Sequence, residues 1–321
     1  MRAPGFWKSG GALPSLLTPV SKLFASATAR RVAQPGWKAQ VPVLCCGNAT
    51  VGGAGKTTLA LDIGRRLAAR NVAVHYLLSG YGGKSKGARR VIPGDTAAVV
   101  GDEALLLSEV APTWTGADRA ESARAAIGAG ARFIVLDDGL QNPSLEKDVS
   151  LLVIDGMTGF GNGQVMPAGP LREPVLECAA RCHAAVLIGD DANAALSQLP
   201  ADLPVLRARL EPGPEMQVLA GKRVLAFAGI ANPQKFFASL EQAGAQIVGR
   251  ASFADHHVFS QQEIDYLLHQ ANEVKAVAVT TPKDAARLSR ENRMRVHAAG
   301  IDLVWEDESE IEALLARLAR G

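Results

Sequence analysis

The sequence predicts an α/β fold, in which a parallel sheet carries helices on both faces and a smaller C-terminal α/β domain follows. From residue 41 onward, short apolar runs alternate with segments of helical periodicity. Buried strands separated by helices are typical of a parallel sheet that is covered on both sides. A Pro- and Gly-rich stretch at residues 211–215 interrupts the alternation, and further strand-like runs follow it. The 321 residues are enough for two domains of ordinary size.

The first group of elements fills residues 41–212. Residues 57–70 have the periodicity of an amphipathic helix. The predicted strands are residues 41–46, 72–78, 133–136, 151–154 and 184–188. Hydrophobic residues make up 48% of the chain but aromatic residues only 5%, so aliphatic side chains and alanine must fill the core.

The second group begins near residue 213, where we place the domain boundary. Its predicted strands are residues 223–228, 246–249, 276–280 and 303–305, with helices between them. Residues 213–321 are therefore expected to form the smaller domain, which contributes to the active site.

The four cysteines indicate neither a disulfide framework nor a metal site. Cys45 and Cys46 are adjacent in an apolar run, where they are expected to pack as small hydrophobic residues. Cys178 and Cys182 are one helical turn apart with His183 beside them, and a zinc site needs more ligands than these. The absence of a disulfide pattern suits a reducing compartment.

Residues 1–40 form a basic head. They hold six of the 34 Lys and Arg residues and none of the 32 acids, although the net charge of the whole chain is only +2. A basic head on a mildly acidic body predicts an anionic partner, either a membrane surface or a nucleic acid.

The apolar pattern of the head favours the membrane. One helical stripe is formed by Leu13, Leu16, Leu17, Val20, Leu23, Phe24 and Ala27. Such a helix can lie in the headgroup layer with its cations on anionic lipid, and Pro19 is expected to kink it or mark its first turn. Polar residues interrupt the segment too early for a transmembrane span. Two alternatives remain: the stripe packs on the protein's own core, or the segment is a signal peptide.

Residues 47–58 predict a phosphate-binding loop. They read Gly-Asn-Ala-Thr-Val-Gly-Gly-Ala-Gly-Lys-Thr-Thr between a predicted strand and a predicted helix. Small residues let backbone N–H groups approach phosphate oxygens at a helix N-terminus. Lys56 is expected on the β- and γ-phosphates of ATP and the Thr57 hydroxyl on Mg²⁺. The predicted nucleotide contacts are Thr50, Val51, Gly52, Gly53, Ala54, Gly55, Lys56, Thr57 and Thr58.

An acidic motif is the second predicted part of the nucleotide site. Four apolar residues run into Asp137 and Asp138, so these carboxylates stand at the end of a strand. One of them is expected to hold Mg²⁺, as an acid does in other P-loop enzymes. The large domain is therefore predicted to be a P-loop NTPase-type sheet.

The chain resembles the tetraacyldisaccharide 4′-kinase family of lipid A synthesis. The resemblance covers residues 47–288 and rests on motifs in the family's order. In the first domain they are the phosphate loop, Gly80-Tyr-Gly-Gly83, Val100-Gly-Asp-Glu103, Asp137-Asp-Gly-Leu-Gln141, Gly161-Asn-Gly163 and Pro167-Ala-Gly-Pro-Leu-Arg-Glu-Pro174. In the second they are Phe227-Ala-Gly-Ile230 with Pro233, Asp255-His-His-Val-Phe259, and Thr281-Pro-Lys-Asp284 with Arg287.

The resemblance implies transfer of the ATP γ-phosphate to the 4′-hydroxyl of an acylated glucosamine disaccharide, at the cytoplasmic face of a bacterial inner membrane. It implies Asp102 as the base, a supporting histidine, and Glu103 near the metal. We assign the support to His256 rather than His257. The alternative for Asp102 is that it caps the helix that follows.

Arg172, Tyr81 and Gln141 are predicted on the substrate side. A guanidinium matches a phosphate such as the 1-phosphate of the family's acceptor. Alternatively, Arg172 pairs with Glu173 or another surface acid.

Two positions depart from the family pattern. Ser79 stands where the family usually has Arg, and Asn142 stands where it often has His. Roles given to those residues in the family do not transfer to this chain.

The rival interpretation is a membrane-associated switch ATPase of the partitioning or targeting type. Those proteins carry an early Lys in the loop, whereas this loop has Thr50 and Val51 there. They also leave the motif at residues 167–174 without a purpose.

Overall fold

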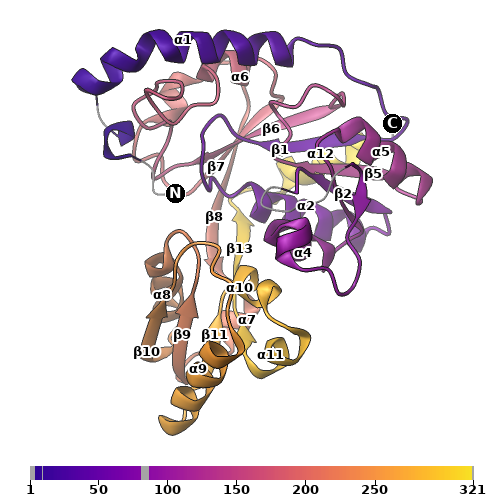
Figure 1. Ribbon diagram of the computed structural model, residues 1–321. Coiled ribbons are helices and arrows are strands. Elements are labelled where there is room, and N and C mark those ends of the chain that lie inside the picture. The colour runs from indigo at the N-terminus through magenta and orange to yellow at the C-terminus, as the bar shows by residue number, and fades with distance from the viewer. Residues whose placement is uncertain (1–3, 9, 81–86, 320–321) are drawn as a thin grey trace.

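A computed structural model describes residues 4–8, 10–80 and 87–319 and contains two sheets. The larger sheet has nine strands in the order β13-β8-β7-β6-β1-β5-β2-β4-β3, and the smaller has four in the order β10-β9-β11-β12. Figure 1 shows the smaller sheet below the larger one, with β8 and β13 running between them.

The larger sheet is parallel except at its two edges. Its strands are β1 (Val43–Gly47), β2 (Val74–Leu78), β3 (Arg89–Arg90), β4 (Thr113–Thr115), β5 (Phe133–Asp137), β6 (Val149–Asp155), β7 (Ala184–Ile188), β8 (Val205–Pro212) and β13 (Ile301–Trp305). Only β3 on β4 and β13 on β8 are antiparallel among the pairings of this sheet in the described residues. The predicted parallel sheet is confirmed, and β3, β4 and β8 are additional strands that the apolar runs did not reveal.

Helices cover both faces of this sheet because its strand residues alternate in direction. Cys46 packs on one side with α2 (Lys56–Ala69), α4 (Asp102–Ser108) and α12 (Glu308–Leu318). Cys45 packs on the other side with α5 (Arg119–Gly128) and α6 (Val175–Ala179). Two short helices, α3 (Ala97–Val100) and η2 (Ala195–Gln198), complete this domain. The adjacent cysteines are free and buried, which is the small-hydrophobe role predicted for them.

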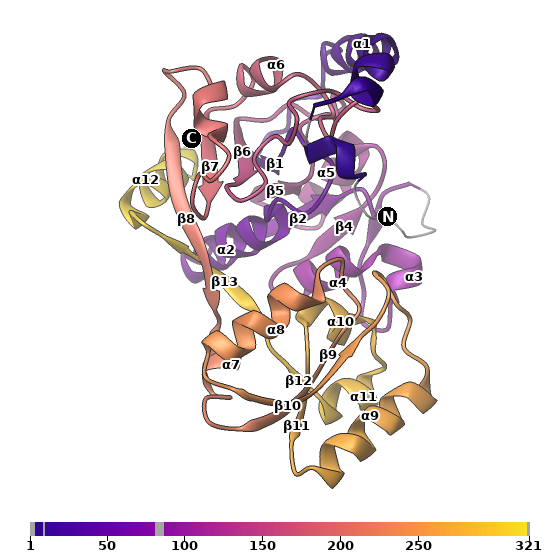
Figure 2. The ribbon, with the colours of Figure 1, turned by 90° about the vertical axis from the view of Figure 1, so that its left-hand side faces the viewer.

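The smaller sheet is wholly parallel across its pairings. Its strands are β9 (Arg223–Ala228), β10 (Gln246–Ser252), β11 (Val277–Thr280) and β12 (His297–Ala298). The helices around it are α7 (Pro214–Gln217), α8 (Pro233–Gln242), α9 (Gln261–Glu273), α10 (Pro282–Arg287) and α11 (Arg290–Arg295). Figure 2 places α10 on the side of this domain that faces α4.

The end of the chain differs from the sequence prediction. Strand 303–305 was expected in the smaller domain, but β13 pairs with β8 in the larger sheet. The helix α12 follows it there, and Ile311 and Leu315 enter the core of the larger domain. Arg66 of α2 bonds both Glu308 and Glu312 of α12. A strand's sheet membership depends on its neighbours in space, which local sequence does not reveal.

The head forms a 3-10 turn, η1 (Gly5–Lys8), and one long helix, α1 (Ala12–Val32), with Pro19 inside it. The helix rests on the protein through Pro14, Ser21 and Thr28, which are buried. The Ser21 hydroxyl accepts a hydrogen bond from the Ala168 amide at 3.1 Å.

The apolar stripe of α1 points away from the protein. Its exposed members include Leu13, Leu16, Val20, Leu23 and Phe24, with Leu16 and Leu23 exposed by 77% and 73%. Packing of this stripe on the core, one of the two alternatives, is therefore wrong. Within the described residues, no helix combines the length and apolar character that crossing a membrane requires.

Candidate active site

The phosphate-binding loop joins β1 to α2 as the sequence predicts. Gly55 is the last residue before the helix and has φ 88°, a conformation that favours glycine. An added Cβ there would lie 2.6 Å from Ile188 Cδ1, so the end of that side chain would have to move. At Gly52 and Gly53 an added Cβ would meet nothing within 4 Å. The loop therefore presents open backbone on its outer side, where a phosphate chain can approach.

Lys56 is held at the start of α2 by polar groups of the same domain. Its Nζ donates to Asn48 Oδ1 at 3.0 Å and lies 3.7 Å from Asp138 Oδ2. The Asn48 side chain also donates to the Thr50 hydroxyl at 3.0 Å. Asn48 is fully buried and links the lysine to the beginning of the loop.

Asp137 has the environment of a cation ligand. It ends β5, and its Oδ2 accepts the Thr57 hydroxyl at 2.9 Å. Its Oδ1 is buried and has no hydrogen-bond partner among the described residues. Burial, and secondarily the nearby Glu103 carboxylate, raise the pKa of Asp137 to about 7 although Lys56 opposes the shift. An orphaned carboxylate oxygen beside a threonine hydroxyl and a second acid fits Mg²⁺.

Asp138 is occupied differently. Its backbone has φ 60°, and its carboxylate is paired at both oxygens with Arg172, at 2.6 and 2.9 Å. Burial raises the pKa of Asp138, but Lys56 and Arg172 together hold it below its usual range. Arg172 therefore pairs with an acid other than its neighbour Glu173, and Asp138 is less available to a metal than Asp137.

Gln141 connects this pair to the loop. Its Oε1 accepts from Arg172 Nη1 at 3.2 Å. Its Nε2 donates to the Asn48 carbonyl at 3.1 Å and to Glu173 Oε1 at 2.8 Å. Glu173 is buried and is bonded at both oxygens by Arg181. The predicted substrate contacts Arg172 and Gln141 thus lie beside the phosphate loop, whereas Tyr81 lies outside the described residues.

The acids Asp102 and Glu103 open α4, where two cations from α10 meet them. Arg287 donates to Asp102 Oδ2, and Lys283 Nζ lies 3.0 Å from Glu103 Oε1. Burial raises the pKa of Asp102, but Lys283, Arg287 and His256 hold it below its usual range. Glu103 also raises the pKa of Asp137, so the opening turn of α4 acts electrostatically on the carboxyl group that ends β5.

The two histidines have different surroundings. His256 has φ 60°, and its Nδ1 lies 3.3 Å from Asp102 Oδ2. His257 stacks on Phe253, with ring centroids 4.7 Å apart, and its Nε2 lies 3.1 Å from Glu263 Oε1. The structure therefore places His256, and not His257, against Asp102.

The helix-cap alternative for Asp102 accounts for only part of its contacts. Gly101 is the N-cap of α4, and it has φ 85° and no side-chain cap hydrogen bond. Asp102 Oδ1 accepts the next amide, that of Glu103, at 3.2 Å. The other carboxylate oxygen is directed at the second domain, which a cap does not require.

Sequence reasoning assigned no role to five residues that hold the site: Asn48, Glu173, Lys283, Asp284 and Arg287. Each lies inside or beside a motif on which the family resemblance rests, so membership of these motifs was the sequence signal that could have indicated their roles. Asn142, which departs from the family pattern, serves a turn: it donates to the Ala117 carbonyl at 3.0 Å and accepts from Ser144.

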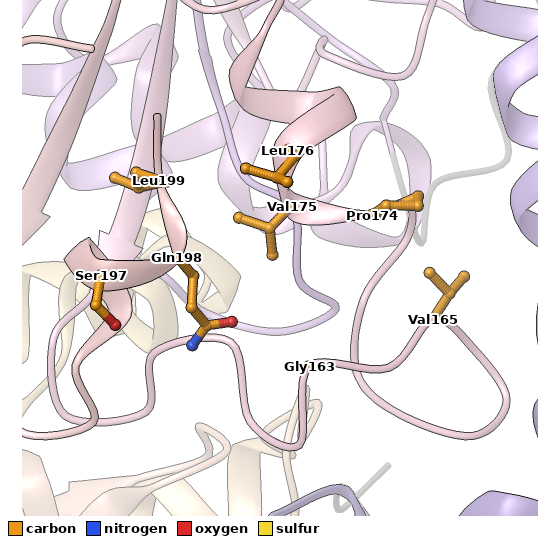
Figure 3. A pocket seen from close by; sticks show the side chains of 8 residues that line it. All are labelled: Gly163, Val165, Pro174, Val175, Leu176, Ser197, Gln198 and Leu199. Atoms are coloured by element: carbon orange, nitrogen blue, oxygen red, sulfur yellow. The ribbon is translucent and has the colours of Figure 1, made fainter. Parts of the chain in front are cut away.

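A cavity of about 510 Å³ is lined in part by Pro174, which follows Arg172 by two residues in the sequence. Figure 3 shows its mostly apolar lining, with Pro174, Val175 and Leu176 on one side and Leu199 opposite. No predicted catalytic or nucleotide residue lines it.

Comparisons with known proteins agree with this geometry. A family model described as tetraacyldisaccharide-1-P 4′-kinase (LpxK) matches residues 13–320. The tetraacyldisaccharide 4′-kinase of Gluconacetobacter diazotrophicus is 51% identical over 318 residues, covering 98% of this chain and 97% of that protein. The protein of the same name from Rhodospirillum rubrum is 47% identical over 327 residues, covering 100% and 99%.

The fold also has a counterpart among solved structures. A crystal structure of LpxK from Aquifex aeolicus in complex with ATP matches with a TM-score of 0.77 at 24% identity, covering 96% of this chain and 99% of that one. That likeness confirms the predicted α/β fold with its P-loop-type sheet. The family model and the relatives establish that this chain belongs to the tetraacyldisaccharide 4′-kinase family.

Proposed function

We propose that this chain transfers the γ-phosphate of ATP to the 4′-hydroxyl of a tetraacylated glucosamine disaccharide 1-phosphate, a step of lipid A synthesis. One observation supports this most strongly. The domain that holds the phosphate loop and Asp137 also presents a carboxylate, Asp102, whose neighbour Glu103 raises the pKa of Asp137, and the second domain holds Asp102 through Arg287 and His256. A switch ATPase has no need of such a carboxylate, whereas a kinase needs one for its acceptor hydroxyl.

The loop and Lys56 form the donor side of the site, which would bind ATP as the phosphate donor. The open backbone at Gly52 and Gly53 suits the phosphate chain, and Lys56 supplies a fixed cation for the charge that develops on the transferred group. Among the predicted metal ligands, Thr57 and Asp137 suit Mg²⁺ best, because Glu103 pairs with Lys283 as Asp138 pairs with Arg172. When bound, the ion would neutralise charge on the β- and γ-phosphates.

Asp102 is the central residue of the acceptor side, which would bind the sugar hydroxyl that receives the phosphate. Its lowered pKa keeps the carboxylate ionised at neutral pH, so that it can orient the 4′-hydroxyl and take its proton. The hydroxyl O–H bond breaks, its oxygen forms a bond to the γ-phosphorus, and the bond to the β-phosphate oxygen breaks to release ADP. Arg172 and Gln141 lie beside the phosphate loop, and we expect them to bind an anionic acceptor, with a phosphate replacing Asp138 as the partner of Arg172.

We place this reaction at the cytoplasmic face of an anionic bacterial inner membrane. The support is α1, which exposes its apolar stripe while Lys22, Arg30 and Arg31 are also exposed. An amphipathic helix with basic flanks binds the interface of anionic bilayers. The same surface would bring the acylated substrate to the enzyme from the bilayer.

The vesicle test uses point variants because deletion of the head would also remove the Ser21–Ala168 contact. Leu16→Glu with Leu23→Glu should lose binding to phosphatidylglycerol-containing vesicles, and high salt should weaken binding of the unaltered chain. Met294→Glu, on an equally exposed residue of α11, is the control. Equal binding by all three proteins would exclude α1 as the membrane contact.

The reaction itself is tested with γ-labelled ATP and the acylated disaccharide 1-phosphate presented in mixed micelles. Label should appear on the acceptor, and ATP turnover should depend on its presence. Turnover without acceptor, with label only in inorganic phosphate, would instead identify a switch ATPase.

A further inference from the structure

Arg287 is the point at which the second domain contacts the acceptor-side carboxylate. It ends α10, and its side chain is only 3% exposed. Nη1 donates to Asp284 Oδ1 at 2.8 Å and to the Gly229 carbonyl at 2.9 Å. Nη2 donates to Asp102 Oδ2 and lies 3.3 Å from His256 Nδ1. One guanidinium therefore contacts Asp284 and Gly229 of its own domain and also reaches Asp102, the proposed base, and His256, its proposed support.

The anchor of Arg287 is rigid. Asp284 is fully buried, and besides Arg287 it accepts the Gly229 amide at 3.0 Å and the Thr281 hydroxyl at 2.7 Å. Thr281 in turn caps α10 through the Asp284 amide. An extra side-chain atom at Gly229 would lie 3.2 Å from Asp284 and 3.0 Å from His257. The guanidinium position is thus fixed by the fold of the second domain, independently of Asp102.

The contacts divide the two oxygens of Asp102. Oδ2 has Arg287 and His256 as neighbours from the second domain. For Oδ1, the described residues supply the Glu103 amide, at 3.2 Å. Because a carboxylate oxygen accepts more than one hydrogen bond, Oδ1 keeps the capacity to accept a hydroxyl. Arginine donates only and does not deprotonate in proteins, so it can hold Oδ2 without competing for the proton.

We infer that Arg287 is a positioning residue for phosphate transfer, which fixes Asp102 Oδ2 and His256 so that Asp102 Oδ1 receives the acceptor hydroxyl. The inference rests on the proposed role of Asp102 as base. It also makes the placement of the second domain a condition for catalysis, because α10 brings Arg287 to α4.

Another ion pair between the two domains provides a contrast. Arg293 of α11 meets Glu109, the C-cap residue of α4, at 3.1 Å, but these side chains are 41% and 54% exposed. An exposed pair of this kind contributes little to stability and touches no acceptor-side group. Glu109→Gln is therefore the matched control, since it removes a contact between the two domains without altering Asp102.

The decisive experiment is a double-mutant cycle of Arg287→Met and Asp102→Asn, with kcat and KM measured for both substrates. Arg287→Met should lower kcat about 10²-fold, because small misplacement of a reacting group has that cost, and should leave the KM for ATP nearly unchanged. In the Asp102→Asn background the same change should have an effect of about twofold or less. Arg287→Lys should recover part of kcat, and Glu109→Gln should behave as the unaltered chain.

Folding is controlled separately. Arg287→Met leaves Asp284 buried without its cation, so Arg287→Met with Asp284→Asn removes both charges. That pair should regain Tm and should bind ATP as the unaltered chain does, while kcat stays low. Recovery of kcat together with Tm would show a purely structural role and overturn the inference.

The other outcomes are also distinct. Equal losses from Arg287→Met in both Asp102 backgrounds would overturn the positioning role while leaving Asp102 as base. Full activity of Asp102→Asn would overturn both the base and its positioning residue but not the kinase. Failure of the unaltered chain to label the acceptor would overturn the proposed function itself.

Discussion

The donor side and the acceptor side of this site are built in opposite ways. The phosphate loop, Lys56 and Thr57 are consecutive residues on one strand–loop–helix unit, and Asp137 ends the neighbouring strand β5. The acceptor side combines Asp102 from the first domain with His256 and Arg287, which lie more than a hundred residues further along the chain. A local unit can form its geometry alone, whereas the acceptor side exists only when the two domains are in contact.

The largest effect is expected on the donor side. Lys56→Ala should lower phosphate transfer by about 10²–10³-fold or more, since the transferring group loses its fixed cation. The protein should still fold, because Lys56 bonds only to polar groups at the edge of the site. Near-normal turnover in a folded Lys56→Ala protein would remove the loop from the mechanism.

Asp102→Asn tests the acceptor side directly. It should lower kcat on the acylated disaccharide about 10²–10⁴-fold with little change in ATP affinity, as removal of a general base does. The amide keeps the shape of the side chain but offers one acceptor oxygen to two donors, the Glu103 amide and Arg287, so Tm should fall modestly. If Asp102 served only as a helix cap, Asp102→Asn would retain activity and stability together.

His256 and His257 are adjacent in the sequence, but only His256 lies against Asp102, so substitutions of the two separate catalytic from structural effects on the acceptor side. His256→Ala should lower kcat less than Asp102→Asn does, and its effect should nearly vanish once Asp102 is changed. His257→Ala should instead lower Tm, since it removes a ring that stacks on Phe253 and meets Phe259 edge-on. A larger kcat loss in His257→Ala than in His256→Ala, at equal Tm, would reverse the assignment.

The smallest effect is expected in the pH dependence of stability without metal. The folded state raises the pKa of Asp137 to about 7, above the ordinary value near 4 of an unfolded chain. Between these values the folded protein binds more protons than the unfolded one, so Asp137 makes stability fall as pH rises through this window. Above pH 7 its contribution is constant.

Thermal melts of the unaltered chain and Asp137→Asn, compared from pH 4 to 8 in EDTA, isolate this contribution. The variant should gain stability relative to the unaltered chain as pH rises. In separate melts without EDTA, added Mg²⁺ should stabilise only the unaltered chain. A difference in Tm that does not change with pH would show that Asp137 titrates normally.

Much of the donor side could be predicted from sequence because each requirement is local. The order of strand, small-residue loop and Lys-Thr helix start dictates a phosphate cradle, and an apolar run ending in Asp137 places a carboxylate at the same sheet edge. The parallel sheet followed from the alternation of buried runs and helices. The exposed apolar stripe of α1 was also visible as a pattern, but the pattern alone did not decide which side the helix buries.

Tertiary structure decided the rest. The sequence did not reveal that Asp138 pairs with Arg172 while Asp137 keeps an unpaired oxygen, since two adjacent acids look alike until the backbone turns at Asp138, where φ is 60°. Nor did it reveal that β13 returns to the large sheet, or that Arg287 reaches Asp102. These contacts depend on the packing of one domain on the other. Sequence patterns therefore determined the residues of each local motif, and their contacts across the domains were decided only by the folded chain.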